Sequence, residues 1–131
     1  MGSGEAPGVL VVTGEPLGAR MAGPAIRALE LARALAGDGR CGQVTLASLG
    51  ECDRSDDAVH LVSVPDAGSL AARVGAVGSV VVQGDVLGRH PWLAGLDVPL
   101  VVDAYDPFHL EQLEQARPWF DRVPAEPLRA G

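Results

Sequence analysis

The sequence GVLVVTGEPLGARMAGPAIRALELARALA, residues 8–36, decides the fold. It begins with a continuous apolar run at 8–13, passes through a glycine-rich loop and ends in a segment with apolar residues at helical spacing. A strand that leads through a loop into a helix is the repeating unit of parallel α/β sheets. The loop raises a second question, whether it is only a turn or a site that holds a ligand.

A helix is predicted over residues 24–36. Gly23 is expected to cap it, Pro24 suits its first position, and Gly37 ends it. Its apolar positions fall at i, i+3, i+4 and i+7 and share one face: Ala28, Leu31, Ala32 and Leu35. Another face carries charged residues that we expect to be solvated: Arg27, Glu30 and Arg33.

Four further apolar runs predict strands at 43–49, 59–64, 79–83 and 98–103. Helices are expected at 66–74, with Asp66 as the cap, at 91–96 and at 107–116. This alternation predicts an α/β fold: a doubly wound, mostly parallel Rossmann-like sheet of about five strands. Only nine residues separate positions 49 and 59, fewer than a parallel crossover usually needs. The strand at 59–64 is therefore expected to pair irregularly or to lie at an edge.

Composition excludes several classes of protein. The chain has 131 residues, which suits one domain, and its net charge is −7 without a single lysine, so we expect no nucleic-acid partner. No apolar run approaches the roughly 18 residues that cross a bilayer, and the N-terminus lacks the basic start of a secretory signal. We therefore expect no transmembrane segment and a cytoplasmic location. Cys41 and Cys52 lack metal-ligand spacing, which predicts free thiols and no metal site.

Ligands of open α/β sheets bind beyond the carboxyl ends of the strands. The first such segment, residues 14–23, has neither dinucleotide-binding nor Walker A spacing, but its glycines and the helix amides after it suit an anion. Arg27 lies beside the first helical turn, where a cation opposes the helix dipole unless an anion accompanies it. Arg20 offers a second guanidinium. In the alternative interpretation, Arg27 pairs with Glu30 and Arg20 with Glu15, and both remain open.

Two other strand ends carry polar residues. Gln83 and Asp85 follow the fourth predicted strand, and His90, just before a proline, is either a helix cap or a substrate contact.

The end of the fifth predicted strand gathers Asp103, Tyr105 and Asp106. Paired carboxylates there suit the binding of sugar hydroxyls or the acceptance of a proton. Asp106 also suits the cap of the next helix, in which His109 either closes the cap or faces the cleft.

Three segments resemble the N-terminal domain of family 4-type glycosyltransferases of the GT-B fold. They are GARMAGPAIR at 18–27, VVVQGDVLGRHPWLAGL at 80–96 and DAYDPFHLE at 103–111, and the likeness spans residues 9–117. Proteins of that family have two Rossmann-like domains that face a cleft, of which the N-terminal one mainly contacts the acceptor. The resemblance implies transfer of a sugar from a nucleotide-sugar co-substrate to an acceptor, with no metal and no further cofactor.

The resemblance also implies roles for individual residues. The loop and helix after the first strand would lie against phosphates and acceptor through four residues: Gly18, Arg20, Gly23 and Arg27. Asp103 and Asp106 would be the catalytic carboxylates. Further substrate contacts would come from Gln83, Asp85, His90, Tyr105 and His109.

The chain departs from the family pattern because the donor domain, with its paired glutamates, and several strands of the N-terminal domain are missing. We expect a flexible N-terminus at 1–7, the acceptor-side domain at 8–117 and a proline-rich tail at 118–131 where the domain is cut short. Alone it is expected to be inactive and to need a C-terminal donor domain or a partner subunit. The competing hypothesis is a non-catalytic Rossmann-like domain that binds a sugar, a nucleotide or a protein. A response-regulator receiver is discarded, since the first strand ends VVTGEP and the chain has no lysine.

Overall fold

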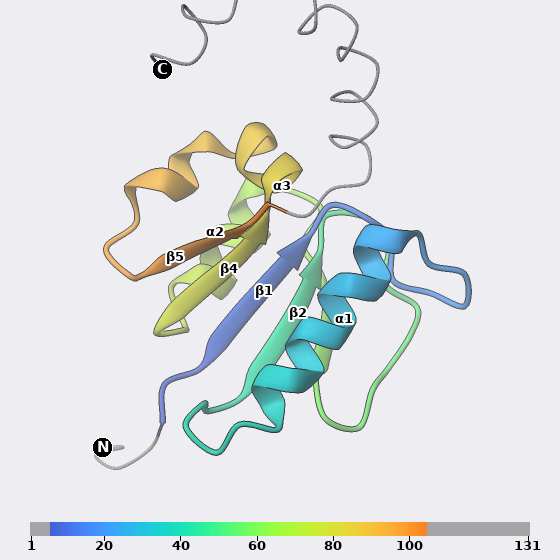
Figure 1. Cartoon of the computed structure of the whole chain (residues 1–131). Helices are drawn as coiled ribbons and strands as arrows, with labels where there is room; N and C mark the ends of the chain where they lie inside the picture. Colours follow the sequence, from blue (N-terminus) through green and yellow to red (C-terminus); the bar gives the residue numbers. More distant parts are fainter. Residues whose placement is uncertain (1–5, 105–131) are drawn as a thin grey trace, which may run out of the picture.

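The computed structural model describes residues 6–104 of the chain (Figure 1). Its elements in chain order are β1 (Val9–Thr13), α1 (Gly23–Ala36), β2 (Val44–Ser48), β3 (His60–Ser63), α2 (Ala67–Val74), β4 (Ser79–Gln83), α3 (Gly84–Arg89), the 3-10 helix η1 (Pro91–Gly95) and β5 (Leu100–Asp103). All five predicted strands are present. The helix predicted at 107–116 and the tail at 118–131 lie outside the described residues.

The five strands form one sheet in the order β3-β2-β1-β4-β5, and every pair is parallel. This confirms the predicted α/β class. Strand order reverses between β1 and β4, which places the topological switch point at that boundary. The order is also that of Rossmann-type sheets, whereas receivers follow the flavodoxin-like order 2-1-3-4-5.

Helices cover both faces of the sheet. Helix α1 lies in front of β1 and β2 in Figure 1, and α2 lies behind. Alternate side chains of each strand serve the two faces, so that Val11 and Leu46 pack with α1, while Leu10 and Val82 pack with α2, α3 and η1. Strands β1 and β2 are buried along their whole length because both of their faces are covered.

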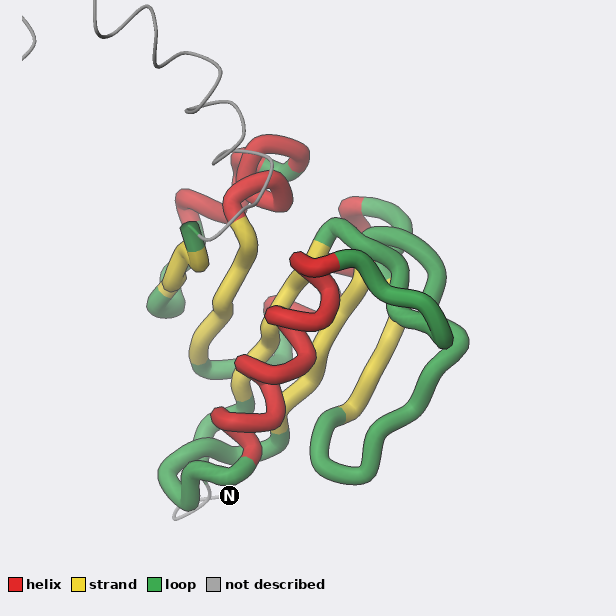
Figure 2. Tube along the Cα trace, turned by 45° about the vertical axis from the view of Figure 1, so that its right-hand side comes forward, coloured by secondary structure: helices red, strands yellow, loops and turns green. Residues whose placement is uncertain are grey.

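Strand β3 lies at one edge of the sheet, as expected, but its pairing is regular. Thr45 faces His60 and Ser48 faces Ser63 in a parallel ladder. The connection over residues 49–59 contains no helix (Figure 2). An extended chain rises about 3.3 Å per residue, so this loop is long enough to return along a short neighbouring strand. It also pairs with the loop after β1 through a bridge between Leu17 and Cys52.

The helices of the structure differ from the predicted ones in three respects. Ala22, not Gly23, is the N-cap of α1, and Gly23 is its first helical residue, while Gly37 ends the helix as predicted. The segment at 91–96 is a 3-10 helix, not an α-helix. Helix α3 was not predicted. Gly84 and Asp85, which the sequence places in the loop after the fourth strand, form its first turn.

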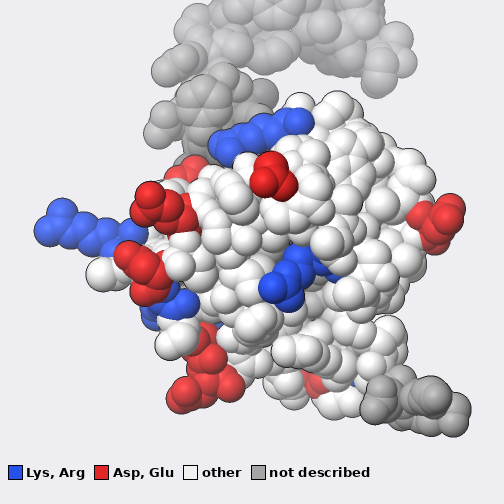
Figure 3. Space-filling view, turned by 180° about the vertical axis from the view of Figure 1, so that it is seen from behind, with Lys and Arg blue, Asp and Glu red and all other residues white. Residues whose placement is uncertain are grey.

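None of the helices within residues 6–104 has the length and apolar character needed to span a bilayer. Viewed from the side of α2, the charged side chains of the described residues are scattered, without a continuous basic surface on that face (Figure 3). Cys41 and Cys52 are free thiols, as predicted.

Candidate functional site

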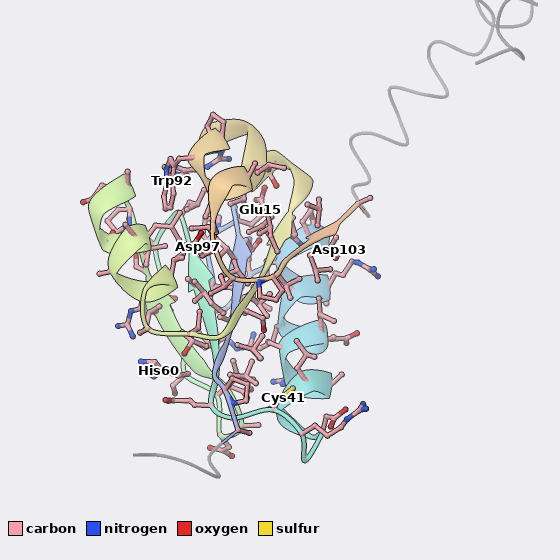
Figure 4. The ribbon with its side chains drawn as sticks, turned by 90° about the vertical axis from the view of Figure 1, so that its left-hand side faces the viewer. Glu15, Cys41, His60, Trp92, Asp97 and Asp103 are labelled. Atoms are coloured by element: carbon pink, nitrogen blue, oxygen red, sulfur yellow. The ribbon has the colours of Figure 1, made fainter. Side chains whose placement is uncertain are left out.

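Every strand of the sheet has a polar residue at its carboxyl end, and these ends lie on the same side of the sheet. Across the sheet from β3 to β5, this polar row consists of Ser63, Ser48, Thr13, Gln83 and Asp103. The carboxyl ends of parallel strands meet at one edge, so the row lines the region where ligands of such sheets bind. Glu15 and Asp103 lie at this end in Figure 4, and Cys41 and His60 lie at the other.

Arg27 of α1 and Asp103 of β5 form a bidentate ion pair. The Arg27 Nε and Nη2 groups donate to the two carboxylate oxygens of Asp103 at 2.7 and 3.0 Å. The Asp103 side chain is 10% exposed and that of Arg27 is 47% exposed. Arg27 is therefore not simply a solvated residue, and the anticipated pair with Glu30 does not form. The anion beside the first turn of α1 is a carboxylate of the chain itself.

Gln83 is buried, and each end of its side-chain amide makes a hydrogen bond. Its Oε1 accepts a 2.7 Å hydrogen bond from the Thr13 hydroxyl, and its Nε2 donates at 2.7 Å to the Pro24 carbonyl. The residue is only 4% exposed. Gln83 thus joins the ends of β1 and β4 to the first turn of α1.

Asp85 closes over the start of the first loop. A Cβ atom added to Gly14 would collide with the Asp85 carboxylate, and Arg89 Nη2 lies 3.6 Å from the same oxygen, Asp85 Oδ2. Gly14 thus allows the close approach of the Asp85 side chain, and its backbone conformation is not unusual. Arg89 brings a second guanidinium to the switch point, about as exposed as that of Arg27.

Gly18 lies away from these residues. Its carbonyl accepts a 3.5 Å hydrogen bond from Arg54, and a Cβ atom at Gly18 would meet Asp53 Oδ1 at 2.7 Å. The loop thus packs against the connection between β2 and β3. Arg20 is exposed and forms no ion pair with any residue of the described range, so the anticipated pair with Glu15 is absent.

His90 lies between α3 and η1 and makes no side-chain cap. Its ring meets that of Trp92 edge-on, with 6.1 Å between centroids. Tyr105, Asp106 and His109 fall outside the described residues. Within residues 6–104, no group of three or more His, Cys, Asp or Glu side chains is arranged to hold a metal ion.

A groove of about 550 Å³ runs beside α1, lined by Gly23, Ile26, Arg27, Glu30 and Leu31. Ile26 is 45% exposed, so the groove offers an apolar surface next to a guanidinium. Another hollow of about 510 Å³ lies at the opposite edge of the sheet near Val59 and His60. The groove beside α1 is the better candidate because it adjoins the switch point.

The structure brings together Gly23, Arg27, Gln83 and Asp103. Asp85 lies against Gly14, Gly18 packs on the connection between β2 and β3, and Arg20 is exposed. Sequence reasoning missed Thr13 and Arg89. A signal existed for both, since the first apolar run ends in Thr13 and Arg89 follows Asp85 at i+4 spacing.

The chain was compared with protein-family models, curated proteins and solved structures. None of the three comparisons found a match.

Proposed function

We propose that this chain forms the acceptor-side domain of a glycosyltransferase that transfers a sugar from a nucleotide-sugar donor to an acceptor. One observation carries the proposal: Arg27 and Asp103 meet beside a groove next to the switch point of a Rossmann-type sheet. The resemblance of segments 18–27, 80–96 and 103–111 supports the choice of this reaction over others.

In the proposed reaction, the bond between the anomeric carbon and the diphosphate breaks, and the diphosphate leaves with the electron pair. The acceptor hydroxyl oxygen forms the new bond and gives up its proton to a carboxylate, for which Asp103 and Asp106 are the candidates. Arg27 and the first amides of α1 offset the charge that develops on the diphosphate.

The substitution Arg27→Ala tests the proposal in the complete gene product, assayed with labelled nucleotide-sugars. Loss of one positioned charge-stabilising donor lowers kcat by roughly 10²–10³-fold in other enzymes, and we expect a loss of that order. The matched control is Arg33→Ala, which removes the arginine that pairs with Asp56 from the same helix. Turnover unchanged by Arg27→Ala would contradict the proposal.

A non-catalytic binding domain is the second candidate, favoured by the Asp103 carboxylate that already holds the Arg27 guanidinium. It predicts saturable binding of a sugar or nucleotide to the 131-residue chain by calorimetry, weakened by Arg27→Ala. It also predicts no transfer by the complete gene product. Detectable transfer by that product excludes this alternative.

A further inference from the structure

The first turn of α1 is held in an unusual way. Its N-cap, Ala22, provides no side-chain hydrogen bond, and the turn contains no acidic residue. Helix α2, in contrast, begins with a full capping box between Asp66 and Ser69. Uncapped first turns fray because their amide groups lack partners. Something other than a cap must fix the start of α1.

Gln83 contacts this turn from strand β4, through a carbonyl oxygen and not through the free amides. Its Nε2 donates to the Pro24 carbonyl at 2.7 Å, inside the first turn and three residues before Arg27. Residues three apart lie on neighbouring parts of a helix surface. A contact that fixes Pro24 therefore also fixes the direction in which the Arg27 side chain leaves the helix.

The orientation of the Gln83 amide follows from the hydrogen bonds around it. The Glu15 amide donates to Thr13 Oγ1 at 3.3 Å, which leaves the Thr13 hydroxyl proton to be donated to Gln83 Oε1. The amide NH2 group must then face the Pro24 carbonyl. Glutamate lacks this donor and methionine lacks both polar ends, so glutamine matches both partners where they do not.

The same chain of bonds reaches the loop after β1. Ser48 Oγ donates to the Glu15 carbonyl at 2.7 Å and accepts from the Gly50 amide at 2.9 Å. Three strand ends, those of β2, β1 and β4, are thus connected through buried residues: Ser48, Thr13 and Gln83. Leaving a buried polar group unsatisfied costs more than an average hydrogen bond gains, so these bonds hold their geometry firmly.

We propose that Gln83 is a positioning residue that fixes the first turn of α1 and thereby holds Arg27 against Asp103. Its importance for catalysis rests on the proposed function, but the contact itself is a property of this chain. This positioning role is separate from the substrate contact that the sequence predicts for Gln83.

The test follows the Arg27 side-chain Nε–H signal in the NMR spectrum of the 131-residue chain. This group donates to Asp103 at 2.7 Å, and the Arg33 Nε–H at the other end of α1 donates to Asp56 at 3.0 Å. The substitutions Arg27→Lys and Arg33→Lys assign the two signals. In Gln83→Met, we expect the Arg27 proton to exchange with water about tenfold faster, as for the loss of one hydrogen bond, and the Arg33 proton to be unaffected.

Thr13→Ser and Thr13→Val provide the matched pair. Serine keeps the hydroxyl and should leave both arginine signals as they are, while valine removes it and should accelerate Arg27 exchange alone. If Gln83→Met does not fold, this pair decides the question. Unchanged Arg27 exchange, or equal acceleration at Arg27 and Arg33, would overturn the proposal. Because no substrate is used, either result is independent of whether the chain belongs to a glycosyltransferase.

Discussion

Gly42 and Gly39 lie three residues apart in the loop before β2 but have opposite surroundings. The Gly42 amide donates to the Pro7 carbonyl at 2.8 Å, and a Cβ atom there would collide with the Ala6 carbonyl oxygen. Nothing lies within 4 Å of a Cβ atom at Gly39. The segment before β1 therefore packs directly on the backbone of Gly42.

We expect Gly42→Ala to lower the free energy of unfolding by about 1–3 kcal/mol, since backbone must shift to admit the methyl group. Gly39→Ala should be neutral or stabilising by up to about 1 kcal/mol, because alanine reduces the entropy of the unfolded chain. Urea denaturation of the two variants measures the difference. Equal free energies of unfolding would show that the close approach at Gly42 has no energetic weight.

The residues of the site show what sequence can and cannot provide at this scale. Arg27 was identified because a cation beside the first turn of a helix needs an anion. Its pairing with Asp103 could not be predicted, because the two residues are 76 positions apart and residue spacing identifies only partners within a helical turn. Gln83 lies at the strand end where the sequence predicts it, but its burial and its contact with Pro24 could not be predicted, since both depend on tertiary packing.

Helix α2 is the element whose start the sequence predicted most fully. The Asp66 carboxylate accepts a 2.8 Å hydrogen bond from the Ser69 amide, and the Asp66 amide donates at 3.3 Å to the Ser69 hydroxyl oxygen. Bonds from Ser69 lower the pKa of Asp66 below its ordinary value of 3.8. The charged carboxylate therefore stabilises the helix above the pKa of the unfolded chain, and this stabilisation is lost as pH falls through the folded value.

We expect Asp66→Ala to lower Tm at pH 7 by roughly a few degrees, because the cap is removed. Asp66→Asn keeps an acceptor for the Ser69 amide and should stay close to the parent protein at pH 7. Its margin over the parent should grow as pH falls below about 4, since asparagine does not titrate. Thermal melts at pH 7 and pH 3 provide the comparison. A parent and an Asn variant with the same pH dependence would contradict the assignment of the cap.

Helix α3 shows why some elements escaped prediction. Its six residues, GDVLGR, include two glycines, which disfavour helix formation. The helix forms because Val86 is fully buried against the sheet and Leu87 packs beside the same core. Strands were easier to predict because each is a short continuous apolar run, whereas α3 depends on Val86 and Leu87, which show no helical periodicity.

The sheet as a whole is unevenly protected from solvent. Strands β1 and β2 are buried at every position, while β3 and β5 at the edges contain no fully buried residue. Val101 and Val102 of β5 are 55% and 43% exposed, although they point to opposite faces. The centre of the sheet is thus the stable part of the described chain.

We expect amide hydrogen exchange to follow this division. The amides of β1, β2 and β4 should exchange only through global unfolding, and those of β3 and β5 through smaller openings of lower free energy. Exchange measured by mass spectrometry or NMR at neutral pH tests this order. Protection in β5 equal to that in β1 would show that the edge is covered in solution.

The reversal of strand order at β1 also affects how the chain folds during its synthesis. Thr13 and Gln83, bonded at the ends of β1 and β4, are 70 residues apart, so the central strand gains one of its two neighbours late in synthesis. Contacts this distant along the chain slow folding. A nascent chain that ends before β4 leaves β1 with an open, apolar edge available for pairing with other chains. We therefore expect the period before residue 83 leaves the ribosome to be the time of greatest aggregation risk.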